Sequence, residues 1–203
     1  MTVDELRSSL LRNKKNGYCH LTADQREEMN AYAHRYMAFM DACKTEREAV
    51  AWSIQAAEAH GFKPLIPGMT VKPGDKLYLN NREKSLILAV VGTAPVAQGV
   101  NICGAHIDSP RMDLKPNPLY EDSEIAYLKT HYYGGIKKYQ WTAVPLAIHG
   151  IVCLKNGSTV TVTIGEDEND PIFMISDLLI HLSAEQLQKP LAKGIEGEQL
   201  NVI

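Results

Sequence analysis

Three segments between residues 76 and 107 constrain the fold more than any other feature of the chain. Strands are expected over residues 76–80, 85–91 and 99–107. The last two are almost continuously apolar, which is typical of strands in a sheet that is covered on both faces. Because helical sequence precedes them, the pattern predicts an α/β fold in which helices flank the sheet.

Two capping boxes mark helices in the first sixty residues. In a capping box, a threonine side chain and the residue three positions later each bond the other's backbone N–H group. Thr22-Ala23-Asp24-Gln25 is expected to open a helix that runs towards Ala42. Thr45-Glu46-Arg47-Glu48 is expected to open a second helix, which Gly61 closes and Pro64 follows.

The character of the chain changes after Leu114. Pro116 and Pro118 are unsuited to a central strand, so this stretch is expected to cross between two structural units. Farther on, Lys155-Asn156-Gly157 is a turn signal, and residues 159–163 alternate strictly between polar and apolar. Together with the apolar residues before the turn, they predict a hairpin with one face in water.

Residues 175–188 are predicted to form an amphipathic helix. The prediction rests on apolar residues near helical spacing: Ile175, Leu178, Leu179, Leu182 and Leu187.

Charge and composition argue against several classes of function. The net charge is −3, and Lys14-Lys15 and Lys137-Lys138 are only pairs, so nucleic acid is not the expected partner. The longest clean apolar run, residues 86–91, is too short to span a bilayer. The first 17 residues have no secretory apolar core, and the four cysteines are scattered without a Cys-x-x-Cys pair. We therefore expect reduced thiols and a cytoplasmic protein.

His106 and Asp108 are candidates for metal chemistry. They lie at the carboxyl end of the third predicted strand, where the sites of α/β proteins cluster. One ring nitrogen of His106 can bind a cation while Asp108 accepts a hydrogen bond from the other, which fixes the tautomer. The spacing alone is weak, however, since a histidine at a strand end is more often structural than ligating, and Asp108 before Ser109-Pro110 also suits a turn.

The segment Ala105-His106-Ile107-Asp108-Ser109-Pro110-Arg111-Met112-Asp113-Leu114-Lys115 resembles the metal-binding signature of the M18 metalloaminopeptidases, a family that includes aspartyl aminopeptidases. The resemblance covers most of the chain from about Leu77 onward. It continues in residues 81–90, 116–120, 129–141, 145–150 and 177–182.

The resemblance implies a fold and an assembly. M18 enzymes have an α/β proteolytic domain with a two-zinc site and a smaller β-rich inserted domain that mediates dimerisation. Residues 1–114 resemble the N-terminal part of the proteolytic domain, with an incomplete zinc-peptidase-type sheet and flanking helices. Residues 115–203 resemble part of the inserted dimerisation domain, so a homo-oligomer is expected.

The resemblance also implies residue roles. His106 corresponds to a zinc ligand, and Asp108 to a residue at the catalytic centre that orients it. His181 corresponds to an active-site histidine, which either ligates zinc or reaches a partner's site; a packing role remains the alternative. The substrates implied are peptides, hydrolysed at their N-terminal residue with two zinc ions.

Several parts of such a site are missing from the sequence. The family's bridging carboxylate, its later ligands and its general-base glutamate follow the inserted domain, and this sequence ends at Ile203. Glu166-Asp167-Glu168 is expected to be a solvated loop rather than a substitute metal site. The chain alone is therefore expected to be inactive. The alternative is a non-catalytic scaffold or assembly partner that keeps the dimerisation surface.

Overall fold

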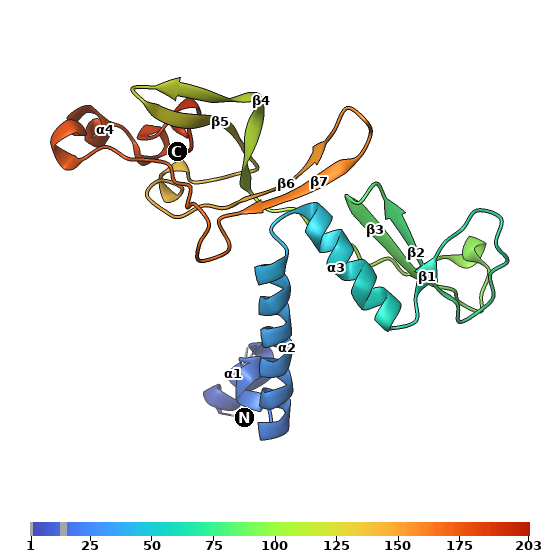
Figure 1. The fold of residues 1–203 in the computed structure, drawn as a ribbon. Coiled ribbons are helices and arrows are strands. Elements are labelled where there is room, and N and C mark those ends of the chain that lie inside the picture. The colour runs from blue at the N-terminus through green and yellow to red at the C-terminus, as the bar shows by residue number, and fades with distance from the viewer. Residues whose placement is uncertain (1, 13–15) are drawn as a thin grey trace. The chain divides into compact units, whose positions relative to one another are not determined.

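The computed structural model describes residues 2–12 and 16–203, and the chain divides into two compact units between Cys43 and Lys44 (Figure 1). Lys14 and Lys15 lie outside the described residues. The first unit contains α1 (Val3–Leu10), a 3-10 helix (Gly17–His20) and α2 (Ala23–Ala42). The Thr22 capping box is confirmed, because the side chains of Thr22 and Gln25 each accept the other's backbone N–H.

The second unit begins with α3 (Glu46–Ala59), whose two ends form as predicted. Thr45 and Glu48 make the capping box at the start. At the end, Gly61 has φ +83° and donates to the carbonyl of Glu58, while Phe62 donates to that of Ala57. This pair of bonds is the Schellman motif, in which glycine adopts the left-handed conformation without a steric penalty.

A small sheet follows α3 and consists of β1 (Lys63–Pro64), β2 (Lys76–Asn81) and β3 (Ser85–Val90), in the order β1-β2-β3. The strands predicted at 76–80 and 85–91 are confirmed to within a residue. β1 is parallel to β2, and β2 is antiparallel to β3. Helix α3 packs on β2 and β3, and the buried apolar residues of these elements are Ala49, Val50, Ala57 and Leu77. Apolar side chains of β3 remain exposed, among them Ile87 and Leu88, so the expected cover on both faces is not present here.

The prediction of a strand over residues 99–107 is wrong. Apart from the short 3-10 helix Val96–Gln98, the chain from 91 to 110 contains no helix or strand, and Ile102 is 86% exposed. A strand needs a neighbour for its backbone N–H and C=O groups, and no described segment pairs with this one. Apolar composition alone therefore does not establish a strand here.

Two hairpins carry most of the remaining structure. The first pairs β4 (Arg111–Asp122) with β5 (Ile125–Tyr133). Pro116 and Pro118 lie inside β4 and do not end it, contrary to expectation. The register shifts between Leu114 and Leu119, which spares both prolines a ladder position that requires an N–H donor.

The second hairpin pairs β6 (Ile148–Cys153) with β7 (Thr159–Ile164), as the alternating sequence predicted. Gly157 has φ +84° in its turn and donates to the carbonyl of Leu154. The predicted turn and strand are both confirmed.

The main core lies where the C-terminal segment returns to the first hairpin. Val202 pairs with Leu128 of β5 through two backbone hydrogen bonds, of 2.7 and 3.0 Å. Four buried residues form the centre, Ile175, Ile195, Leu200 and Val202, and partly buried side chains such as Met112, Tyr132, Trp141 and Phe173 surround them. Short helices complete this part of the chain: the 3-10 helices Lys138–Gln140, Leu191–Lys193 and Gly197–Gln199, and the two described next.

The prediction of an amphipathic helix over residues 175–188 is wrong. Only the 3-10 helix η4 (Ile180–Leu182) and α4 (Ala184–Gln188) form there. Ile175 is fully buried and its carbonyl accepts from Ala143, whereas Leu178 is 55% exposed. Met174 pairs with Ile203 at 2.9 and 3.0 Å, and this extended pairing competes with a helix at the start of the segment.

Candidate metal centre

His106 and Asp108 come together in the extended segment before β4. Nδ1 of His106 lies 2.9 Å from the Oδ1 atom of Asp108 and 2.9 Å from the backbone carbonyl oxygen of the same residue. Both acceptors favour the tautomer that carries its proton on Nδ1. That tautomer leaves the lone pair of Nε2 for a cation, and the His106 side chain is 80% exposed.

Tyr133 and Arg111, from the first hairpin, influence the charge of Asp108. The Tyr133 hydroxyl, at the end of β5, hydrogen-bonds the Asp108 carboxylate, which lowers the pKa of Asp108 and raises that of Tyr133. The guanidinium carbon of Arg111 lies 4.2 Å from the centroid of the Tyr133 ring, within the range of a cation–π contact. Arg111 begins β4, where its Cα pairs with that of Tyr133.

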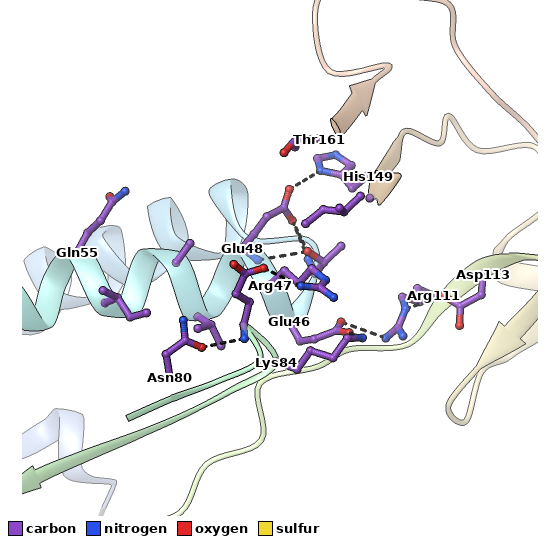
Figure 2. A pocket seen from close by; sticks show the side chains of 17 residues that line it. Glu46, Arg47, Glu48, Gln55, Asn80, Lys84, Arg111, Asp113, His149 and Thr161 are labelled. Atoms are coloured by element: carbon purple, nitrogen blue, oxygen red, sulfur yellow. Dashed lines mark hydrogen bonds and ion pairs between the residues drawn. The ribbon is translucent and has the colours of Figure 1, made fainter. Parts of the chain in front are cut away.

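Arg111 is itself fixed by two carboxylates. Its Nε donates to Asp113 at 2.8 Å, and its terminal nitrogen lies 3.7 Å from Glu46 at the start of α3 (Figure 2). Glu46 also accepts a 2.8 Å hydrogen bond from Lys84, and this bond lowers the pKa of Glu46 despite its partial burial. Polar contacts therefore link α3 to the start of β4, three residues after Asp108.

A pocket of about 790 Å³ lies beside this chain of contacts (Figure 2). Its lining comes from the first turns of α3, from the β2–β3 turn, and from β4, β6 and β7. Its basic side chains already have carboxylate partners, since Arg47 pairs with Glu83, Lys84 with Glu46 and Arg111 with Asp113. His106 and Asp108 do not line it.

His149 occupies one wall of the pocket between two carboxylates. Nδ1 lies 2.8 Å from Glu48 (Figure 2). Nε2 lies 2.8 Å from Glu166, and the His149 side chain is 12% exposed. Burial opposes the charged ring, but the hydrogen bonds to Glu48 and Glu166 outweigh it and raise the pKa of His149. No pattern in the sequence indicates this cluster, because Glu48 and His149 are 101 residues apart. Glu166 was expected to be a solvated loop residue, but its carboxylate also contacts Nε2 of His149.

His181 lies in η4 and is exposed. No interaction joins it to His106 or Asp108 in the described chain, so the structure brings only two of the three candidate residues together. Within residues 2–12 and 16–203, no three His, Cys, Asp or Glu side chains are arranged to hold a metal ion. His106 therefore fits one zinc ligand, with its free nitrogen oriented, but the described chain does not contain a whole zinc site.

No described helix combines the length and apolar character needed to cross a membrane.

Comparisons with a protein-family model and with curated proteins both identify similar proteins. Residues 39–203 match the family model for the aminopeptidase I zinc metalloproteases, M18. A probable M18 family aminopeptidase 1 from Clostridium acetobutylicum is 51% identical over 200 residues, which are 97% of this chain and 43% of that protein.

Solved structures give the same result. The crystal structure of an M18 aminopeptidase from Thermotoga maritima has a TM-score of 0.85 at 39% identity, covering 95% of this chain and 42% of that one. For aminopeptidase I from Clostridium acetobutylicum the TM-score is 0.83 at 48% identity, covering 96% and 43%. The chain thus spans less than half the length of these relatives. The sequence match and the structural likeness together show that the chain belongs to the M18 family of zinc metalloaminopeptidases.

Proposed function

We propose that the chain is the N-terminal portion of a zinc aminopeptidase and contributes His106 to its metal site. The observation that carries the proposal is the geometry of His106, whose Nδ1 is held by Asp108 while Nε2 is left for a cation. When bound in such a site, zinc polarises the scissile carbonyl and lowers the pKa of a water ligand to about 7. Asp108 orients the imidazole and strengthens it as a ligand.

The remaining parts of the site are proposed to lie outside this sequence. Two zinc ions need more ligands than the described residues supply, and a general-base glutamate is also required. His181 is proposed to join the site as a zinc ligand or in a partner subunit. The 203-residue chain alone is accordingly inactive.

Aminoacyl-anilide hydrolysis tests the proposal. The chain alone is compared with a chimera that joins it to the part of the Clostridium acetobutylicum relative that the match does not cover. We expect zinc-dependent release of the N-terminal residue by the chimera, and rates equal to a blank for the chain. Metal-dependent turnover that co-purifies with the chain would contradict its assignment as an inactive portion.

The division into domains follows from the same resemblance. Residues 1–114 are proposed to belong to the proteolytic domain, and 115–203 to an inserted domain through which copies associate in the cytoplasm. The proposed inserted domain exposes several large apolar side chains that are close together in sequence: Leu178, Leu179, Ile180 and Leu182. Exposed apolar patches mark association surfaces.

Those exposed residues also favour a second candidate function, that of a non-catalytic scaffold. Light scattering with and without a chelator separates the two candidates. A defined oligomer whose mass the chelator does not change supports the scaffold, whereas a monomer or an aggregating species supports the severed enzyme.

A further inference from the structure

His149, in β6, contacts carboxylates from two elements that are far apart in the sequence. Its Nδ1 lies 2.8 Å from Oε1 of Glu48, in the first turn of α3, and its Nε2 lies 2.8 Å from Oε1 of Glu166, in the loop after β7. An ionised carboxylate only accepts hydrogen bonds, so a ring that bonds two of them must donate from both nitrogens. Only the protonated imidazole carries both N–H groups.

We propose that protonated His149 joins the loop after β7 to the start of α3 by donating to Glu166 and Glu48 at once, and that loss of one proton releases Glu166. We call these three residues the His149 bridge. The neutral ring has one N–H group and can hold one carboxylate, while its other nitrogen presents a lone pair to the second. The complete bridge therefore exists in one charge state of the ring and not in the other.

Glu48 is the carboxylate that stays with the neutral ring. Its Oε2 accepts from the backbone N–H groups of Thr45 at 2.8 Å and of Lys44 at 2.9 Å, so its position does not depend on His149. The Glu166 carboxylate is 46% exposed and has no other hydrogen bond or ion pair within residues 2–12 and 16–203. Neutral His149 should accordingly keep its proton on Nδ1, towards Glu48.

The loop that carries Glu166 is closed by Asp170. Oδ2 of Asp170 accepts from the backbone N–H of Gly165 at 2.8 Å and from that of Asp167 at 3.5 Å. These bonds fix the backbone on both sides of Glu166. The contact with His149 then fixes the Glu166 side chain.

No charged group of the described chain other than Glu48 and Glu166 bonds the ring of His149. Strand β7, which pairs with β6, has no ionisable side chain. The charged neighbours from the surrounding elements are Lys44 before α3, Glu46 and Arg47 in α3, Glu83 and Lys84 in the β2–β3 turn, Arg111 and Asp113 in β4, and Asp167, Glu168 and Asp170 in the loop. Burial opposes the charged ring, but the hydrogen bonds to Glu48 and Glu166 outweigh it and raise the pKa of His149.

The bridge crosses the proposed domain boundary. Glu48 belongs to residues 1–114, whereas His149 and Glu166 belong to residues 115–203. The bridge is complete below the unfolded histidine pKa of about 6.5, and it loses Glu166 as pH rises through the raised folded pKa. A proton therefore strengthens the contact between the two proposed domains. No zinc is involved, so the inference does not depend on the proposed metal site.

Urea unfolding of the 203-residue chain at about pH 6 and about pH 9 tests the proposal, because these values lie on either side of an ordinary histidine pKa while the carboxylates stay ionised. Glu166→Gln removes one charge from an exposed side chain, so the fold should survive. Glu168→Gln is the matched control, since it makes the same change two residues along the same loop. The Glu168 carboxylate has no hydrogen bond or ion pair within the described chain.

At the lower pH, Glu166→Gln should raise the equilibrium constant for unfolding about tenfold, or about 1.4 kcal/mol. This is near the lower end of what a hydrogen bond to a charged group contributes, because the Glu166 side chain is 46% exposed. At the higher pH the same variant should change the constant by no more than about twofold, as for other surface sites. Glu168→Gln should stay within about twofold at both pH values.

The same substitution made in a His149→Asn chain separates the bridge from a direct effect of the Glu166 charge. Without the ring, Glu166→Gln should have no effect on the unfolding constant at either pH. Equal effects of Glu166→Gln at the two pH values, no effect at the lower one, or a full effect in the His149→Asn chain would each overturn the proposal.

Discussion

Ile175 gives a sharp test of how the C-terminal segment folds. Ile175 and Leu178 would share the apolar face of the amphipathic helix that the sequence predicted, but the structure buries the first and exposes the second. Ile175→Ala removes three buried carbon atoms, which at about 0.8 kcal/mol each costs about 2.4 kcal/mol in transfer free energy. The cavity left in the cluster of Ile195, Leu200 and Val202 adds to this, so the free energy of unfolding should fall by about 2–5 kcal/mol.

Leu178→Ala is the control and should change the free energy of unfolding by no more than about 0.5 kcal/mol, as for other exposed sites. Urea unfolding followed by circular dichroism gives both values under one set of conditions. Equal losses of unfolding free energy for the two variants would contradict the pairing of residues 174 and 203. Such a result would support the helix predicted over residues 175–188.

Three further predictions concern other parts of the second unit. His149→Asn should destabilise the protein most near pH 6 in urea titrations. The stability that His149 contributes is full below its unfolded pKa of about 6.5, and it is lost as pH rises through the raised folded pKa. The stability that Glu48 contributes is lost as pH falls below about 4.5, because its folded pKa is lowered. A loss of stability independent of pH would argue against this ion cluster. Gly165→Ala should cost about 1–3 kcal/mol in thermal unfolding, because φ is +103° and the new Cβ would lie 3.1 Å from Ala147 Cα; Gly157→Ala, with open space around it, should cost less, and the reverse order would be inconsistent with the packing. Calorimetric titration of the chain with zinc should show no tight site, since the described residues form no group of three ligands; nanomolar binding would refute that arrangement.

Features with local causes were predictable from the sequence. The capping boxes at Thr22 and Thr45 depend on side chains three residues apart, and the second hairpin depends on a turn around Gly157. The approach of Asp108 to His106 belongs to the same class. In each case, the interacting groups lie two or three residues apart, so a contact between them does not depend on the folding of distant segments.

Features with distant partners were not predictable in this way. The apolar segment at 99–107 resembles a buried strand, but a strand exists only where another supplies its hydrogen bonds. Ile175 has helical spacing to its neighbours, yet the carbonyl it presents to Ala143 decides its conformation. His149 obtains its ion pairs from Glu48 in α3 and from Glu166 after β7, and no local pattern marks it.

The zinc content of the chimera tests the central claim most directly. Elemental analysis of the purified wild-type and His106→Ala chimeras, both shown to be folded, gives the number of zinc ions per subunit. If His106 is a ligand, the variant should contain one zinc ion fewer and lose nearly all hydrolysis of aminoacyl anilides. Full zinc occupancy in the variant would contradict the assignment of His106 to the metal site.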